Sequence, residues 1–192
     1  FFGKKNFLGT FSPPYAVIND SVFLETLDER NWRSGIAEAI KVALIKDAVF
    51  FNWITENSRA LNDRNMEIME QLIFRCAQLH LEHIGTAGDP FEKGSSRPLD
   101  FGHWAAHKLE YLSGYQVLHG EAVAVGVAMD AVYSRLSGRL DGTDLQRILN
   151  VLTTLGFEIF HPLLLQETTM EINPALVKGL EEFREHLAGD LT

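Results

Sequence analysis

Three histidines of this chain lie close together in the sequence, at His103, His107 and His119. His103 and His107 are four residues apart, so on a helix they share one face, with Cβ atoms about 5–6 Å apart. This spacing suits two imidazoles that bind one metal ion, or one metal ligand beside one proton carrier. His119 adds a third imidazole at the start of an apolar helical stretch. For the pair alone, two histidines that meet by chance on a solvated helix face are an equally good interpretation.

Two charged residues, Glu38 and Lys41, stand among apolar neighbours on an earlier stretch with helical periodicity. The simplest interpretation is an ordinary ion pair on a solvated helix face. Apolar neighbours favour burial instead, and a buried charge must be paired or bound to a ligand. In that case Glu38 becomes an oxygen ligand beside His103 and His119, and Lys41 binds an anionic substrate. Two histidines, one carboxylate and an open position are typical of catalytic zinc.

The elements that must position these residues are predicted to be helices. Apolar residues recur at helical spacing along most of the chain, and Asp20 and Asp28 stand where N-caps are expected. The predicted helices cover residues 22–27, 28–46, 47–57, 62–83, the segment around His103 and His107, 119–140, 144–155 and 175–186. A loop rich in glycine and proline interrupts them at residues 85–98, and one short strand is predicted at residues 15–19. We therefore expect a mostly α fold with a short strand near the N-terminus.

Composition excludes several classes of function. The 192 residues carry a formal net charge of −9, and lysine and arginine do not gather into a patch, so a nucleic-acid partner is not expected. No apolar stretch is long enough to span a membrane, so no membrane partner is expected either. The single cysteine, Cys76, excludes an internal disulfide and fits a reducing compartment, as a buried core thiol. We expect a cytoplasmic protein.

Four motifs in order resemble the 3-dehydroquinate synthase family of sugar phosphate cyclases. Three of them are RSGIAEAIK at residues 33–41, DFGHWAAH at residues 100–107 and LHGEAV at residues 118–123. The fourth, GKKNFLGTF at residues 3–11, is similar to the segment that follows this family's nucleotide-binding domain. The resemblance implies that residues 1–19 are a junction from a preceding NAD-binding domain. Residues 20–192 would then form an α-helical domain that binds metal and substrate.

The resemblance also implies an activity. Enzymes of this family oxidise a hydroxyl of a phosphorylated sugar with NAD, eliminate phosphate, return the hydride and close a carbocycle by an intramolecular aldol step. The cofactors implied are NAD and a divalent metal, zinc or cobalt, in a homodimer. Carried over by motif, the metal ligands are Glu38, His103 and His119, and the catalytic pair is Lys41 and His107.

The substrate-binding residues implied by the resemblance are Lys5, Asn6, Arg97 and Asp100, whereas the residues that contact NAD stay unassigned. Asp100 stands where the dehydroquinate enzymes have asparagine, Arg97 is one position away from the family arginine, and His80 stands in place of a lysine. These differences remove positive charge and should weaken the binding of a substrate that bears a carboxylate. They favour a branch similar to the 2-epi-5-epi-valiolone synthases, which take neutral sugar phosphates.

Two alternatives stay open at this point. The iron-containing alcohol and glycerol dehydrogenases share the two-domain plan and hold a metal on helical histidines. A helical module that kept its metal site without catalysis is the second alternative. Because family catalysis takes place between two domains, we expect the helical domain alone to be inactive.

Overall fold

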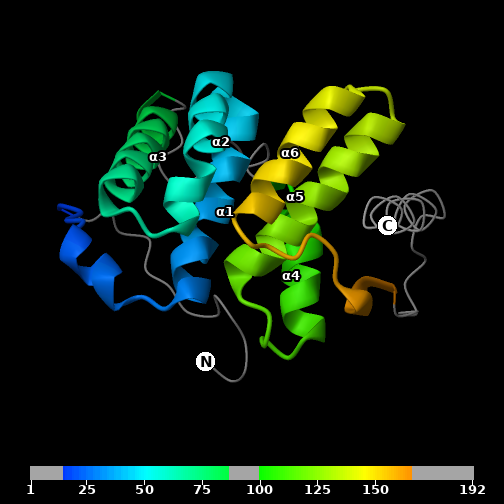
Figure 1. Ribbon diagram of the computed structural model, residues 1–192, viewed down its shortest axis with the longest axis horizontal. Coiled ribbons are helices and arrows are strands. Elements are labelled where there is room, and N and C mark those ends of the chain that lie inside the picture. The colour runs from blue at the N-terminus through cyan, green and yellow to red at the C-terminus, as the bar shows by residue number, and fades with distance from the viewer. Residues whose placement is uncertain (1–14, 87–99, 166–192) are drawn as a thin grey trace.

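The computed structural model describes residues 15–86 and 100–165, and all regular elements in these ranges are helices (Figure 1). Two are short 3₁₀ helices, η1 (Ser21–Thr26) and η3 (Pro162–Leu165). The α-helices are α1 (Glu29–Lys46), α2 (Ala48–Asn62), α3 (Met66–Thr86), α4 (His103–Leu112), α5 (His119–Leu136) and α6 (Gly142–Thr154). The mostly α prediction is confirmed, while the helix predicted at residues 175–186 lies outside the described residues.

The strand predicted at residues 15–19 is wrong. These residues form no strand in the structure, and the side chains of Val17 and Ile18 are 75% and 88% exposed. Their β-branched side chains favour extended backbone, but a strand also needs a neighbour that accepts and donates its ladder hydrogen bonds. The described part of the chain offers no such neighbour.

Aspartate side chains cap three of the α-helices, and the cap of α6 sets a boundary that the sequence placed elsewhere. Asp28 accepts a hydrogen bond from the Asn31 N–H at the start of α1, as predicted, and Asp47 does the same for Phe50 at the start of α2. Asp141 accepts from the Asp144 N–H, so α6 begins two residues earlier than predicted. Helix α2 runs on to Asn62, and Arg64, with a left-handed φ of 61°, separates it from α3.

Helices α1 and α5 lie at the centre of the fold. Helix α5 packs against α1, α4 and α6, and α1 packs against α2 and α3 as well (Figure 1). Two glycines allow these close approaches, because a Cβ at Gly120 would lie 2.3 Å from the Ser34 backbone, and one at Gly126 would lie 1.9 Å from the Gly102 carbonyl oxygen. Gly120 thus brings the start of α5 against α1, and Gly126 brings the start of α4 against α5.

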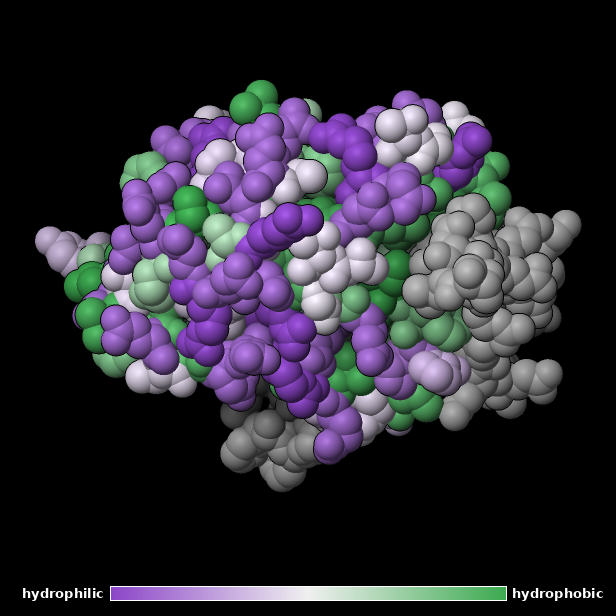
Figure 2. All heavy atoms as spheres, viewed as in Figure 1, coloured by the Kyte–Doolittle hydropathy of each residue, from purple (hydrophilic) through white to green (hydrophobic). Residues whose placement is uncertain are grey.

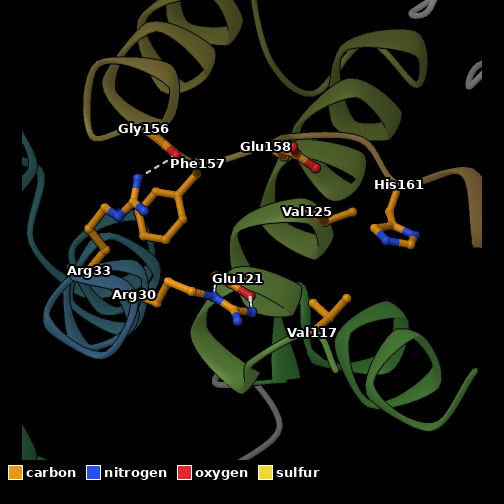
Figure 3. A pocket seen from close by; sticks show the side chains of 9 residues that line it. All are labelled: Arg30, Arg33, Val117, Glu121, Val125, Gly156, Phe157, Glu158 and His161. Carbon is orange, nitrogen blue, oxygen red and sulfur yellow. Dashed lines mark hydrogen bonds and ion pairs between the residues drawn. The ribbon is translucent and has the colours of Figure 1, made fainter. Parts of the chain in front are cut away.

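Polar contacts tie the start of α1 to the start of α5 and to the segment after α6 (Figure 3). The Arg30 guanidinium donates two hydrogen bonds of 2.7 Å to the carboxylate of Glu121, and Glu121 also accepts from the Leu118 N–H. Arg33 donates to the Gly156 carbonyl at 2.8 Å. These residues border a hollow of about 360 Å³ whose two arginines are therefore already engaged within the fold.

Polar side chains cover much of the face shown in Figure 2, with smaller apolar patches between them. Cys76 is half-buried against the core rather than fully buried, and burial raises the pKa of its thiol to about 11. Its thiol is therefore protonated and unreactive near neutral pH. Within the described ranges, no helix is both long enough and apolar enough to cross a membrane.

The cap of α2 gives the fold a pH dependence. Arg75 and the Phe50 N–H donate hydrogen bonds to Asp47 and lower the pKa of its carboxyl. Because the pKa of Asp47 is lower in the folded than in the unfolded state, its stabilising effect is complete above the pKa of the unfolded state. The effect is lost as the pH falls through the pKa of the folded state. Urea unfolding should find Asp47→Asn less stable than the parent by about 0.5–1 kcal/mol at neutral pH. This difference in the free energy of unfolding should become smaller below about pH 4. A difference that stays the same at lower pH would contradict the proposed role of the Asp47 carboxylate.

Candidate functional site

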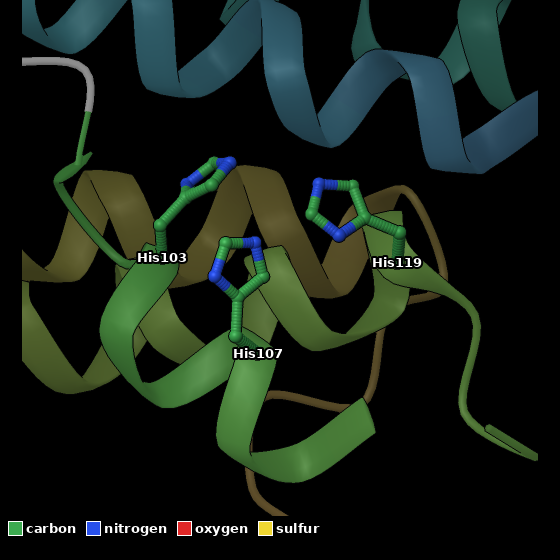
Figure 4. A group of neighbouring side chains, drawn as sticks. All are labelled: His103, His107 and His119. Atoms are coloured by element: carbon green, nitrogen blue, oxygen red, sulfur yellow. The ribbon is translucent and has the colours of Figure 1, made fainter. Parts of the chain in front are cut away.

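Three histidines converge where α4 and α5 begin (Figure 4). His103 is the first residue of α4, His107 lies one turn later, and His119 is the first residue of α5. One ring nitrogen from each comes within 4.8 Å of the others, and the ring centroids are 5.3–5.7 Å apart. His103 and His119 are half-buried, whereas His107 is exposed. Three imidazoles at this separation can bind one divalent metal ion.

A carboxylate from α1 joins the histidines. Oε1 of Glu38 lies 3.0 Å from Nε2 of His119 and 3.4 Å from Nε2 of His103. Its other oxygen, Oε2, lies 2.8 Å from Nζ of Lys41, whose side chain is only 7% exposed. The Glu38–Lys41 ion pair is therefore present, but it lies against the histidines and not on a solvated face.

The charges of this cluster shift the titration of its members. Burial works to raise the pKa of Glu38, but hydrogen bonds from His103, His119 and Lys41 outweigh it and hold that pKa well below its usual range. Hydrogen bonds to Glu38 and Glu110 raise the pKa of His119 in spite of its partial burial. Glu38 is thus ionised at neutral pH, as a metal ligand must be. Protons compete for His119, so metal binding by this cluster should weaken as pH falls.

Glu110 is a neighbour of the site that the sequence analysis missed. Its side chain is 5% exposed, and its Oε2 lies 2.9 Å from Nδ1 of His119. The available signal was its place three residues after His107, on the same face of α4. The contact to His119, from another helix, could not be read from that spacing.

The start of α4 is held by α5 instead of by its own N-cap. Gly102 occupies the N-cap position with a left-handed φ of 76° and offers no capping side chain. Asp130 of α5 supplies the acceptor, with hydrogen bonds of 2.6 Å from the Gly102 N–H and 3.0 Å from Nε1 of Trp104. Because His103 lies between these two donors, Asp130 fixes the position of His103 relative to α5.

Removing this anchor should cost stability. Asp130→Ala leaves the buried Gly102 N–H without an acceptor, and we expect a loss of about 2 kcal/mol in the free energy of unfolding. Trp104→Phe removes only the second, more exposed hydrogen bond and should cost less than about 1 kcal/mol. Denaturant unfolding of both variants measures these losses in the free energy of unfolding. Equal losses would show that the hydrogen bond from the Gly102 N–H contributes no more than the one from Trp104.

A hollow of about 750 Å³ opens beside Glu38, between α1 and α3. Most of its lining is apolar, but Glu38 and His80 both border it. A ligand at Glu38 would therefore have room on this side of α1. His80 itself is exposed and lies outside the group of three histidines.

The structure brings together five of the residues singled out by the sequence, namely Glu38, Lys41, His103, His107 and His119. Asp100 is exposed, and no hydrogen bond or ion pair joins it to Glu38 or to the described histidines. Lys5, Asn6 and Arg97 lie outside the described residues. Their assignment as substrate-binding residues stays a prediction.

The described residues form a helical domain in which imidazoles and a carboxylate from three helices make a candidate metal-binding site, and comparison with known proteins assigns the chain to one family. The chain belongs to the 3-dehydroquinate synthase C-terminal family, whose model matches residues 35–176. This result confirms the resemblance seen in the sequence and favours the cyclases over the iron-containing dehydrogenases.

Two known proteins illustrate the relationship. The chain is 40% identical over 159 residues to a 3-dehydroquinate synthase of Coxiella burnetii (strain CbuG_Q212), across 82% of this chain and 44% of that protein. Its structure is similar to that of ValA, a 2-epi-5-epi-valiolone synthase from Streptomyces hygroscopicus subsp. jinggangensis 5008, solved with NAD⁺ and Zn²⁺ bound. The TM-score is 0.76 at 31% identity, over 97% of this chain and 50% of that one. The chain thus spans about half the length of these relatives.

Proposed function

We propose that this chain is the metal- and substrate-binding half of an NAD- and zinc-dependent sugar phosphate cyclase. Residues 1–19 would join it to a nucleotide-binding domain, and the reaction would take place between the two. The observation that carries the proposal is the meeting of Glu38 with His103 and His119 at hydrogen-bond distance, with His107 alongside. Membership of the 3-dehydroquinate synthase C-terminal family supports it.

The residues present fit a zinc ion. We assign Glu38, His103 and His119 as its ligands, since imidazole nitrogen and carboxylate oxygen are common zinc donors and cobalt accepts the same set. When bound, the metal would polarise a substrate hydroxyl and the carbonyl formed from it. Three protein ligands leave a position open for that oxygen.

Lys41 and His107 would act on the anionic parts of the substrate. Nζ of Lys41 is held 2.8 Å from Glu38, so a positive charge stays beside the metal ligands. His107 is the exposed member of the three histidines and stacks on His119 at a centroid distance of 5.7 Å. An exposed imidazole at this edge can give a proton to the phosphate oxygen as phosphate leaves.

Within this family we propose a neutral sugar phosphate as the substrate. Asp100 places a carboxylate three residues before His103, where it would repel a carboxylate on the substrate. We expect kcat/KM of the protein joined to its nucleotide-binding domain to be at least about 10-fold higher for a neutral heptulose phosphate than for the corresponding acid. Asp100→Asn should narrow that ratio. Equal or better turnover of the acid would contradict the assignment.

Phosphate release tests the proposed activity itself. The protein that joins this chain to its nucleotide-binding domain, supplied with NAD and zinc, should release phosphate from one of the two sugar phosphates. His107→Gln should slow that release by about 100-fold or more while leaving the metal in place. Metal binding with no phosphate release from either substrate would favour the module that has kept its metal site without catalysis.

A further inference from the structure

Glu110 is a buried carboxylate that the proposed mechanism does not use. It lies in the last turn of α4 with 4% of its surface exposed. Burying an ionised carboxylate removes it from water at a large desolvation cost, so it needs a hydrogen-bond partner within the protein. One partner in this structure is the imidazole of His119, whose Nδ1 is 2.9 Å from Oε2 of Glu110.

The two ring nitrogens of His119 face two different carboxylates. Nδ1 faces Glu110 at 2.9 Å, and Nε2 faces Oε1 of Glu38 at 3.0 Å. A neutral imidazole has one proton to donate, and an ionised carboxylate only accepts. Glu38 already receives a hydrogen bond from Lys41 and lies next to His103. If Nε2 binds the metal, the proton of His119 lies on Nδ1, where Glu110 is the acceptor at 2.9 Å.

We propose that Glu110 is a positioning residue that holds the proton of His119 on Nδ1 and turns Nε2 toward His103 and Glu38. This inference rests on the proposed metal site, because Nε2 is the atom that would bind the metal. A carboxylate behind a metal-binding histidine fixes both the tautomer and the orientation of its ring.

The position of Glu110 on α4 makes the arrangement a link between helices. His103, His107 and Glu110 lie along one side of α4, and His119 opens α5. The hydrogen bond from His119 to Glu110 therefore locks the first residue of α5 against the helix that carries the other two histidines. Any shift of α4 along α5 would break it.

Metal affinity gives the first test. We expect Glu110→Ala to weaken zinc binding, measured by competition with a chromogenic chelator, by about 10–100-fold. Glu110→Gln should lose less affinity, because its amide oxygen still accepts a hydrogen bond from Nδ1. Asp47→Asn is the matched control, since it removes a carboxylate with an ion-pair partner, but Asp47 caps the start of α2 and contacts none of the three histidines. Its zinc affinity should equal that of the parent.

The tautomer of His119 gives a second test that needs no metal. In ¹⁵N NMR of the metal-free chain at alkaline pH, the proton of His119 should lie on Nδ1 and exchange slowly with water. In Glu110→Ala the two tautomers should mix, and in Glu110→Gln the Nδ1–H form should persist.

Three outcomes would overturn the inference. One is unchanged zinc affinity in Glu110→Ala, another is an Nδ1–H tautomer that survives in that variant, and the third is an equal loss of affinity in Asp47→Asn. If Glu110→Ala does not fold, Glu110→Leu replaces it in both tests, because leucine fills the space but accepts no hydrogen bond from Nδ1. If the parent binds no zinc, the metal site fails while the NMR result still decides the role of Glu110.

Discussion

Glu38→Gln is expected to lower the zinc affinity of the chain by more than about 100-fold, whereas His107→Gln should lower it by less than about 10-fold. The reason is geometric, because Oε1 of Glu38 lies within 3.4 Å of the Nε2 atoms of both His103 and His119. His107 is exposed and is assigned here to proton transfer. Zinc affinity by chelator competition compares the two variants directly.

A larger loss of zinc affinity in His107→Gln than in Glu38→Gln would indicate a different set of metal ligands. His103, His107 and His119 bring their donor atoms within 4.8 Å of one another, so three histidines could bind a metal without Glu38. A large loss in His107→Gln with little change in Glu38→Gln would establish that set and reduce Glu38 to the partner of Lys41. Because Glu38→Gln leaves the buried Lys41 unpaired, the double variant Glu38→Gln/Lys41→Met separates the loss of a ligand from a loss of stability.

Gly126→Ala is expected to destabilise the fold by about 3 kcal/mol or more. An added Cβ would lie 1.9 Å from the carbonyl oxygen of Gly102, which is backbone and cannot rotate away. Helix α5 would have to move away from the turn that precedes His103. Thermal or urea unfolding measures the loss, and zinc affinity should fall with it because His103 moves relative to His119.

Gly35→Ala is the matched control on the facing helix. Nothing lies within 4 Å of a Cβ at Gly35, and alanine is a better helix former than glycine. This variant should therefore be as stable as the parent or more stable by up to about 1 kcal/mol. If Gly126→Ala were tolerated as well as Gly35→Ala, the close packing of α5 on the turn before α4 would not be a requirement of the fold.

The helices could be predicted from the sequence because the signals that set them are local. Asp28 and the apolar spacing behind it are enough to place α1. The short strand was wrong for the opposite reason, since the pairing of residues 15–19 depends on a neighbour that the local sequence does not reveal. Helix ends shifted by a few residues where a positive φ at Arg64, or a cap at Asp141, decided the boundary.

The site was only partly predictable. The spacing of His103 and His107 places them on one face. The approach of Glu38 to His119 joins residues 81 positions apart, and the residues alone offered it only as one of two interpretations until the family resemblance favoured it. Glu110 and Asp130 escaped prediction because each acts on a residue of another helix. Contacts of this kind depend on how α4 and α5 pack, and the sequence pattern of a single helix does not contain that information.

The central claim is that this cluster binds one divalent metal ion. Elemental analysis of the chain joined to its nucleotide-binding domain tests it most directly, with His119→Ala as the comparison. We expect about one zinc per chain in the parent and almost none in the variant. A well-folded parent without metal, or a variant that keeps its full content, would contradict it.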